Sequence, residues 1–275
     1  SIKMEANKFI KEVYRRMELR SIDSSTYRDK NPELHISYDS FINDVNAENA
    51  SYHYEHLLPK NKNAKILDIG FGNGWFMAAC IKLGYTNIYG AEFNGKEKMT
   101  EVCKVAKSIK SVFDIDDNIG DFLSTNNNKY DFIHLSHVIE HIPKHSLLYI
   151  VDALYASLNK NGILLLRTPN MEGPLALTNL YITPGHEFGF SSSNLGAILT
   201  ICGFDDVSLH NFSVNKPTIK QRFGNILRSL FILFTKFKFR LFGDTMENRN
   251  FRFGLELIVS AKRGSFPELF NKKYR

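Results

Sequence analysis

The stretch ILDIGFGNGWF, residues 66–76, constrains the fold more than any other part of this chain. An apolar run leads into Asp68, glycines follow at Gly70, Gly72 and Gly74, and an apolar segment with helical spacing begins directly after them. Glycine adopts positive φ at no steric cost and lets a ligand approach the backbone, because it has no Cβ atom. We therefore predict a buried strand, a tight turn that faces a ligand, and a helix, in that order.

The same alternation of short apolar runs and longer segments with helical spacing continues along the chain. Runs rich in Ile, Leu and Val predict strands at residues 64–71, 87–93, 111–117, 129–136, 163–169, 205–214 and 251–263. The segments between them predict helices at residues 73–84, 95–109, 144–162 and 191–203, the third of which closes at Gly162. This order predicts an α/β fold, a doubly wound and mostly parallel seven-stranded sheet of the Rossmann-like type. Ligands of such a sheet bind outside the carboxyl ends of its strands.

Four segments follow from this pattern. We predict an N-terminal helical cap at residues 1–62, a ligand-binding core at 63–214, a basic amphipathic insertion at 215–250, and the final strand with a tail at 251–275. The insertion therefore lies between the last two strands.

The cysteines and the apolar runs indicate the compartment. The three cysteines lie inside apolar, helix-like stretches, which favours buried thiols in a reducing compartment: Cys80, Cys103 and Cys202. The N-terminal stretch lacks the apolar region of a secretory signal, and no apolar run reaches the roughly 20 residues that span a bilayer. We expect a cytoplasmic protein.

Two further acidic residues stand where an adenosine ligand needs them. Glu92 follows the glycine loop by about twenty residues, at the end of the second predicted strand, where a carboxylate can accept hydrogen bonds from both ribose hydroxyls. Asp121, in IGDF, follows the third predicted strand, near the expected place of an adenine amino group. The loop differs from the nicotinamide-binding fingerprint G-x-G-x-x-G because its third glycine comes one residue early.

These residues closely resemble the class I S-adenosylmethionine-dependent methyltransferases of the ubiquinone-pathway type. The similarity extends from about residue 64 to residue 207 through YDFIHLSHVIEHIP, LNKNGILLLRTPN and HEFGFSSSNLGAILTICGF. The resemblance implies S-adenosyl-L-methionine as cofactor and S-adenosylhomocysteine as product. It implies that the cofactor is bound by Asp68, Gly70, Phe71, Gly72, Gly74, Glu92, Phe93, Asp121, Phe122, Ser136 and His137.

The stretch LSHVIEHIPKH carries a second pattern. His137, Glu140 and His141 have the spacing H-x-x-E-H, which also occurs in one group of zinc proteases. A cofactor loop upstream argues against a protease. In related ubiquinone-pathway and small-RNA 2′-O-methyltransferases a similar E-x-x-E-H stands here, and the RNA group adds a later histidine that His186 matches.

That resemblance leaves two interpretations open. In one, a divalent metal is bound by His137, Glu140, His141 and His186 and lowers the pKa of an acceptor hydroxyl. In the other, Glu140 and His141 are a structural pair at the start of a helix. As a group, His137, His141 and His186 are also candidate catalytic bases, which favours an oxygen acceptor over carbon. For each single histidine, a hydrogen-bonded structural role fits the sequence as well.

Aromatic residues flank the expected pocket in two places. One group is Tyr52, His53 and Tyr54, and the other is Tyr181, Phe188 and Phe190. Such rings either stack on sugar or adenine faces or cover an edge of the core.

The basic insertion is the last informative segment. Residues 216–243 contain seven Lys/Arg and no Asp/Glu, so the rest of the chain carries −1 of the net +6. Wound as a helix, the segment gathers on one face Ile226, Leu230, Leu233, Phe234, Phe237 and Leu241. It suits either the interface of an anionic membrane or packing on the sheet or another subunit; nucleic acid is the weaker partner, because the stretch is too apolar for a phosphate track.

Together these patterns favour an O-methyltransferase that acts on a saccharide, either a cell-surface glycan or a lipid-linked sugar of polysaccharide biosynthesis, at the inner face of the membrane. The alternatives are an RNA 3′-terminal 2′-O-methyltransferase and a quinone-type small-molecule O-methyltransferase. A non-catalytic cofactor-binding subunit that anchors a complex to membrane is more remote.

Overall fold

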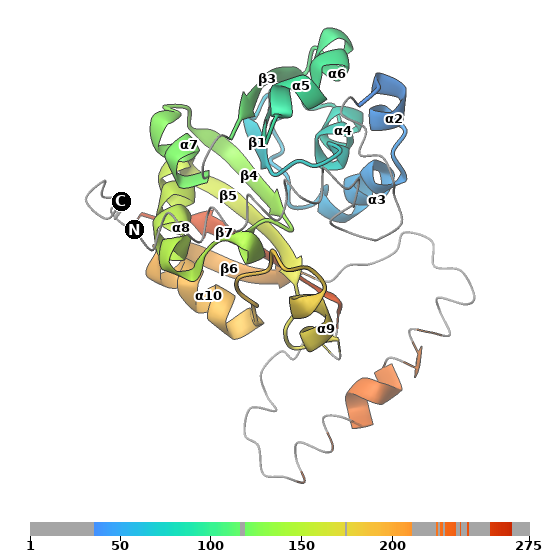
Figure 1. Cartoon of the computed structure of the whole chain (residues 1–275), viewed down its shortest axis with the longest axis vertical. Helices are drawn as coiled ribbons and strands as arrows, with labels where there is room; N and C mark the ends of the chain where they lie inside the picture. The colour runs from blue at the N-terminus through green and yellow to red at the C-terminus, as the bar shows by residue number, and fades with distance from the viewer. Residues whose placement is uncertain are drawn as a thin grey trace.

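A computed structural model describes residues 36–115, 119–173, 175–210 and 254–265, together with scattered positions between 224 and 241. The strands are β1 (Ile66–Ile69), β2 (Ile88–Glu92), β3 (Ile109–Asp114), β4 (Tyr130–Ser136), β5 (Leu158–Pro169), β6 (Phe204–His210) and β7 (Glu256–Arg263). The helices are α2 (Tyr38–Ile42), α3 (Val45–Tyr54), α4 (Trp75–Lys82), α5 (Gly95–Lys98), α6 (Thr100–Val105), α7 (Ile119–Thr125), α8 (Leu147–Ser157), α9 (Ala176–Tyr181) and α10 (Ser192–Ile201). Two short 3₁₀ turns, η1 (Ile139–His141) and η2 (Lys144–Ser146), follow β4 (Figure 1).

The seven strands form one sheet in the order β3-β2-β1-β4-β5-β7-β6. The pairs among β1 to β5 are parallel, whereas β7 runs antiparallel to both β5 and β6. The order reverses between β1 and β4, which places a ligand site at the carboxyl ends of these strands. The predicted doubly wound, mostly parallel seven-stranded sheet is therefore confirmed.

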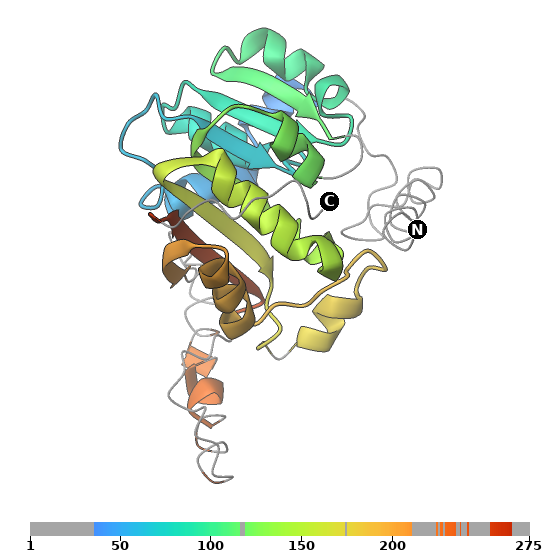
Figure 2. The same cartoon turned by 90° about the vertical axis from the view of Figure 1, so that its left-hand side faces the viewer.

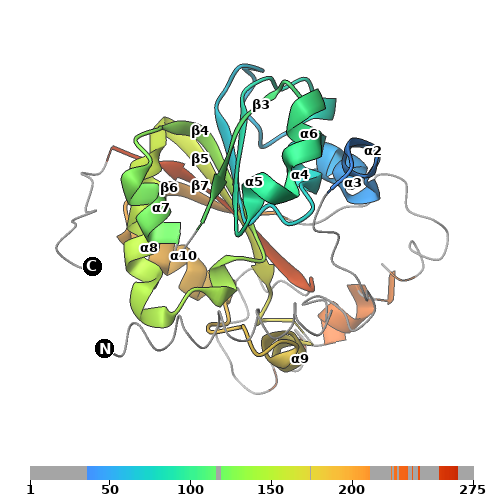
Figure 3. The same cartoon turned by 45° about the horizontal axis from the view of Figure 1, so that its top comes forward.

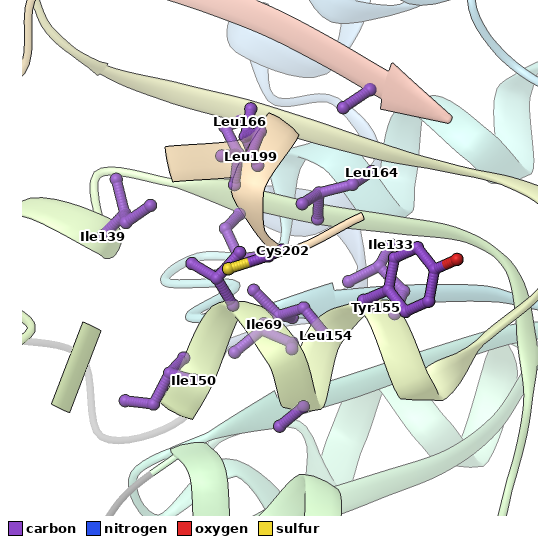
Figure 4. Close-up of a cluster of buried hydrophobic side chains, with 14 of the residues drawn as sticks. Ile69, Ile133, Ile139, Ile150, Leu154, Tyr155, Leu164, Leu166, Leu199 and Cys202 are labelled. Atoms are coloured by element: carbon purple, nitrogen blue, oxygen red, sulfur yellow. The ribbon is translucent and has the colours of Figure 1, made fainter. Parts of the chain in front are cut away.

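Helices cover both faces of the sheet because successive strand residues point to opposite faces. Ile66 faces the cluster that packs under α2, α3, α4 and α6, while Leu67 and Ile69 face the one under α7, α8 and α10. Figure 3 shows the sheet between these two helix groups, and Figure 2 shows the yellow-green α8 crossing one face. On that face Leu154 and Leu199 meet strand residues such as Leu166 (Figure 4).

Several predicted helix ends are observed. Ser191 caps α10 through a capping box, in which its side chain accepts a hydrogen bond from the N–H of Asn194 and its own N–H donates to the Asn194 side chain. Gly84 and Gly203, which follow α4 and α10, adopt positive φ of +84° and +93°.

Other boundaries differ from the prediction. The helix expected to close at Gly162 ends at Ser157, because Leu158 already pairs with Tyr130 of β4, and the sharp turn at Asn161 (φ +63°) lies inside β5. The single helix predicted over residues 95–109 is two short helices that meet at Met99. Helix α9 has no counterpart among the predicted elements.

The cap and the insertion are described only in part. Helices α2 and α3 lie before β1, and residues 1–35 of the predicted cap lie outside the described part. Of the insertion, positions between 224 and 241 are helical, with large apolar side chains exposed, among them Leu233 and Phe237. The four predicted segment boundaries stay predictions. None of the helices that the structure describes is both long and apolar enough to cross a bilayer.

Candidate active site

The glycine loop joins β1 to α4 at the predicted ligand edge. Gly70, Gly72 and Gly74 adopt positive φ of +68°, +55° and +77°. A Cβ at Gly70 would lie 2.3 Å from Val138 Cγ2, and one at Gly74 would lie 2.7 Å from the ring of Phe41. A Cβ at Gly72 would meet no atom within 4 Å. The outer two glycines therefore serve the packing of the loop, while Gly72 leaves its backbone open to an incoming molecule.

Glu92 ends β2 beside that open backbone. Its carboxylate accepts a 2.9 Å hydrogen bond from the N–H of Gly72 and another from the N–H of Phe93. These two bonds fix the carboxylate at the loop, and an ionised carboxylate retains further lone pairs for hydroxyl donors. Phe93 is 52% exposed next to it. The loop and Glu92 thus fit a ribose with its adjoining chain, as predicted for S-adenosylmethionine.

Asp68 lies below the loop in the interior. It is 2% exposed, and its Oδ1 lies 2.7 Å from Nδ1 of the equally buried His134 on β4. Burial raises the pKa of Asp68, and the neighbouring imidazole works in the opposite direction. Phe76 of α4 stacks on the His134 ring at 3.8 Å between centroids. The sequence prediction did not include His134, although a histidine inside the apolar strand YDFIHLS is a polar residue that needs a buried partner.

The remaining predicted cofactor residues lie around the same edge. Phe71 is 2% exposed and packs on Gly90, so its side chain belongs to the core. Asp121 lies in the first turn of α7, and the ring of Phe122 packs against that of Phe113 on β3 at 5.4 Å. Ser136 ends β4 opposite Arg167 of β5. The structure brings these positions to one side of the sheet, and their contacts with a cofactor stay predictions.

His137, directly after β4, is the centre of a charged network. Its φ is +54°, and its N–H donates to the carbonyl of Arg167 at 2.8 Å. Nδ1 lies 3.1 Å from a Glu140 oxygen, and Nε2 lies 3.0 Å from an oxygen of Glu256. Desolvation opposes protonation of this ring, but the two carboxylates outweigh it and raise the pKa of His137 to about 9. His137 is therefore a cation at neutral pH, which does not accept a proton.

The two carboxylates have further partners. Arg167 donates two hydrogen bonds to Glu256, at 2.8 and 2.7 Å. Burial works against ionisation of Glu256, but hydrogen bonds from His137 and Arg167 prevail and lower its pKa to about 2. The buried Glu140 accepts a 3.0 Å hydrogen bond from the hydroxyl of Thr168. The sequence prediction missed Arg167, Thr168 and Glu256, whose positions at the ligand edge follow only from the pairing of β5 with β7.

His141 and His186 face each other beside this network. Nδ1 of His141 lies 2.9 Å from the carbonyl of Gly185, and Nδ1 of His186 lies 2.8 Å from that of Asn179. A carbonyl only accepts, so each Nδ1 carries a proton, and Nε2 is the nitrogen that holds the lone pair whenever the ring is neutral. Burial, together with the neighbouring His186, lowers the pKa of His141 against the opposing charge of Glu140. His141 is thus neutral at physiological pH and suited to accept a proton.

Glu140, His141 and His186 form a group that suits a metal ion. One ligand atom from each lies within 4.8 Å of the others. Backbone carbonyls orient both imidazoles, the arrangement that usually holds metal-binding histidines in place. His137, the fourth predicted ligand, is outside this group, and its Nδ1 lies 3.1 Å from an oxygen of Glu140.

The predicted aromatic residues separate into two kinds. Tyr54 and Phe190 are buried at 2% and 0% exposure, so they belong to the core. Tyr181, at the end of α9, is 78% exposed.

Comparison with known proteins agrees with this architecture. The methyltransferase domain family matches residues 41–209, more than half of the chain. The type II methyltransferases M.HincII and M.HindII of Haemophilus influenzae are 51% identical to the chain over 39 residues, which is 14% of this chain and 8% of theirs.

Two solved structures share the fold. A S-adenosylmethionine-dependent methyltransferase from Archaeoglobus fulgidus aligns with a TM-score of 0.54 and 19% identity, over 82% of this chain and 96% of that one. Human N-acetylserotonin methyltransferase, in complex with S-adenosylmethionine, aligns with a TM-score of 0.51 and 15% identity, over 80% and 52%. The chain belongs to the methyltransferase domain family. Within it, the Rossmann-like sheet and glycine loop are those of the class I S-adenosylmethionine-dependent group, which confirms the predicted family.

Proposed function

We propose that this chain transfers the methyl group of S-adenosylmethionine to a hydroxyl of a saccharide at the inner face of a membrane. The observation that carries the transfer is the open backbone at Gly72 beside the fixed carboxylate of Glu92, with the neutral imidazole of His141 at the same edge of the sheet. Gly72 and Glu92 would hold the adenosine part of the cofactor, which brings the reactive methyl group when bound.

His141 suits a hydroxyl acceptor. The acceptor oxygen forms a bond to the methyl carbon, the carbon–sulfur bond breaks with its electron pair going to sulfur, and the hydroxyl proton goes to Nε2 of His141. The hydrogen bond from Nδ1 to the Gly185 carbonyl keeps that nitrogen protonated and Nε2 able to accept. A carbon acceptor does not carry an acidic proton of this kind at the moment of attack.

Glu140, His141 and His186 also fit a divalent cation, which would lower the pKa of the acceptor hydroxyl. Two imidazoles and one carboxylate favour zinc, iron or manganese over magnesium. Because the ligand atom of His141 is the Nε2 that would otherwise take the proton, the cation and the base are alternative ways to activate the same hydroxyl.

Two surface features support a saccharide on a lipid carrier. Tyr181 is exposed on the helix whose Asn179 carbonyl holds His186, and a tyrosine ring can stack on a sugar face. Residues 216–243 of the insertion combine seven basic residues in the sequence with exposed apolar side chains such as Leu233 and Phe237. A basic, apolar segment of this kind suits the interface of an anionic bilayer.

The test has two stages. Calorimetry with S-adenosylmethionine and S-adenosylhomocysteine measures cofactor binding, and Gly72→Val, which fills the open position, should abolish the heat. Transfer of a tritiated methyl group is then compared for lipid-linked saccharides, free saccharides, RNA and quinone analogues. We expect label in the lipid-linked saccharide alone. Transfer to RNA or quinone would overturn the acceptor, and the absence of cofactor heat would overturn methyl transfer itself.

A further inference from the structure

A second apolar surface lies outside the basic insertion. Five large side chains at and beside α9 are exposed to solvent: Leu175 (46%), Leu177 (73%), Tyr181 (78%), Ile182 (61%) and Leu255 (57%). We call this set the α9 surface. Leu177 and Tyr181 are four residues apart on one helix, so they lie on the same face of it. A cluster of apolar side chains this exposed is typical of an interaction site.

The α9 surface is tied by hydrogen bonds to the candidate acceptor site. The Asn179 carbonyl accepts from Nδ1 of His186, and the Asn179 side chain donates to the carbonyl of Leu255 at 3.4 Å. The N–H of Asn170 donates to the same Leu255 carbonyl at 3.0 Å. Leu255 in turn precedes Glu256, the partner of His137. Hydrogen bonds and chain connectivity thus link the α9 surface directly to His186 and His137.

Charge indicates what this surface meets. Residues 173–185 contain no Asp, Glu, Lys or Arg. In the sequence of the insertion, residues 216–243 contain seven basic and no acidic residues. The orange helical positions of the insertion lie on the same side of the molecule as α9 (Figures 1 and 3). An uncharged apolar surface, on the same side as a segment whose sequence is rich in basic residues, is complementary to an anionic bilayer, which offers acyl chains under negative headgroups.

We propose that the α9 surface is a second membrane contact, which inserts Leu177, Tyr181 and Ile182 into the headgroup region of an anionic bilayer. This inference rests on the membrane location in the proposed function and extends it from the insertion to the acceptor site. With α9 in the interface, His141 and His186 lie just above the headgroups. The acceptor is then an amphiphile whose hydroxyl reaches the site from the lipid side.

Binding of the full chain to vesicles tests the inference. Sedimentation with phosphatidylcholine vesicles containing phosphatidylglycerol is measured for L177D/Y181D, for the insertion variant L233D/F237D and for V105D. Val105, on α6, is 54% exposed and remote from α9, so V105D is the matched control for an added charge. We expect V105D to bind as the unaltered chain does, and L177D/Y181D and L233D/F237D each to bind at least about tenfold more weakly.

Three outcomes would overturn the proposal. L177D/Y181D could bind vesicles normally while L233D/F237D does not, which would leave the insertion as the membrane contact. The unaltered chain could fail to bind anionic vesicles at all. A dimer in light scattering that L177D/Y181D breaks, without loss of vesicle binding, would assign the α9 surface to a second copy of the chain. Calorimetry with S-adenosylmethionine on each variant separates these outcomes from failure of the methyltransferase assignment, because the α9 surface lies outside the glycine loop.

Discussion

His137 and Glu256 are 119 residues apart in the sequence, and their side chains meet at 3.0 Å. Their hydrogen bond joins the end of β4 to the start of β7, across the intervening β5. His137, which has a positive φ, is held by the carboxylates of Glu140 and Glu256 and by a hydrogen bond from its N–H to the carbonyl of Arg167. The network fixes the segment that leads to Glu140 and His141.

The first prediction concerns the pH dependence of stability. His137→Gln should lower the free energy of unfolding by about 1 kcal/mol at pH 6, a modest value because the ring is 43% exposed and solvent screens its ion pairs. The folded-state pKa of about 9 lies above the ordinary 6.5. The contribution of His137 is therefore complete below pH 6.5 and is lost as the pH rises through 9. Urea unfolding at pH 6, 8 and 10 measures it, with His145→Gln as control. A difference that stays constant with pH would contradict the assigned cation.

The second prediction separates the glycines. Gly72→Ala should fold with a loss of about 1–2 kcal/mol from its positive φ, yet weaken S-adenosylmethionine binding, because the added methyl group occupies the open side of the loop. Gly70→Ala should cost more stability, because its Cβ would meet Val138 at 2.3 Å. Thermal unfolding and calorimetry give the two quantities. Equal cofactor affinity for Gly72→Ala and the unaltered chain would place the cofactor elsewhere.

The third prediction concerns the base. His141→Gln should lower kcat by roughly 10²–10⁴ with unchanged cofactor affinity, while His145→Gln, an exposed histidine four residues on, should keep full turnover. A base must be neutral to act, and burial lowers the pKa of His141 below the ordinary 6.5. The midpoint of the kcat/KM profile should therefore lie below pH 6.5, with the rate falling toward more acid pH. Unchanged kcat in His141→Gln would remove it from the chemistry.

The fourth prediction decides between the metal site and a structural pair. If a cation takes the place of the base at this site, elemental analysis of the purified chain should find one divalent cation, and His186→Gln should lose it, because a ring nitrogen of His186 is one of the three ligand atoms. Chelation should then lower the Tm of the unaltered chain and leave that of His186→Gln unchanged. Metal-free protein with full activity would support the structural interpretation.

The fifth prediction concerns the pair below the loop. His134→Leu removes the partner of the buried Asp68 and should destabilise the chain by about 3–5 kcal/mol, while the double variant H134L/D68L should recover much of this loss. Chemical denaturation of the single and double variants measures the coupling. Additive effects would show that the two side chains act independently.

Most of the fold could be predicted from the sequence because apolar spacing and glycines are local signals. The strand at residues 66–69, the helix capped by Ser191 and the glycine turns at Gly84 and Gly203 are of this kind. The predicted end of the helix at residues 144–162 was wrong, because Leu158 fits an apolar helix face as well as it fits a strand. Its pairing with Tyr130, a contact distant in sequence, decides between them.

The candidate site divides in the same way. Gly72, Glu92 and His141 stand in contiguous motifs, so their chemistry could be predicted. The roles of Arg167 and Glu256 could not be predicted, because neither residue stands in a recognisable motif. Only the pairing of β7 with β5, which is distant in sequence, brings the two side chains together. That alignment also changes the role of His137, since a histidine between two carboxylates is a cation and not a base.

The antiparallel direction of β7 has a consequence for how such a molecule can diversify. β6 ends and β7 begins at the catalytic edge, at His210 and Glu256, so both ends of the segment between them emerge where the acceptor would bind. A change in the length or sequence of that segment leaves the paired residues of β6 and β7 themselves unaltered. A graft between these two positions is therefore a direct route to redirect the enzyme toward new acceptors.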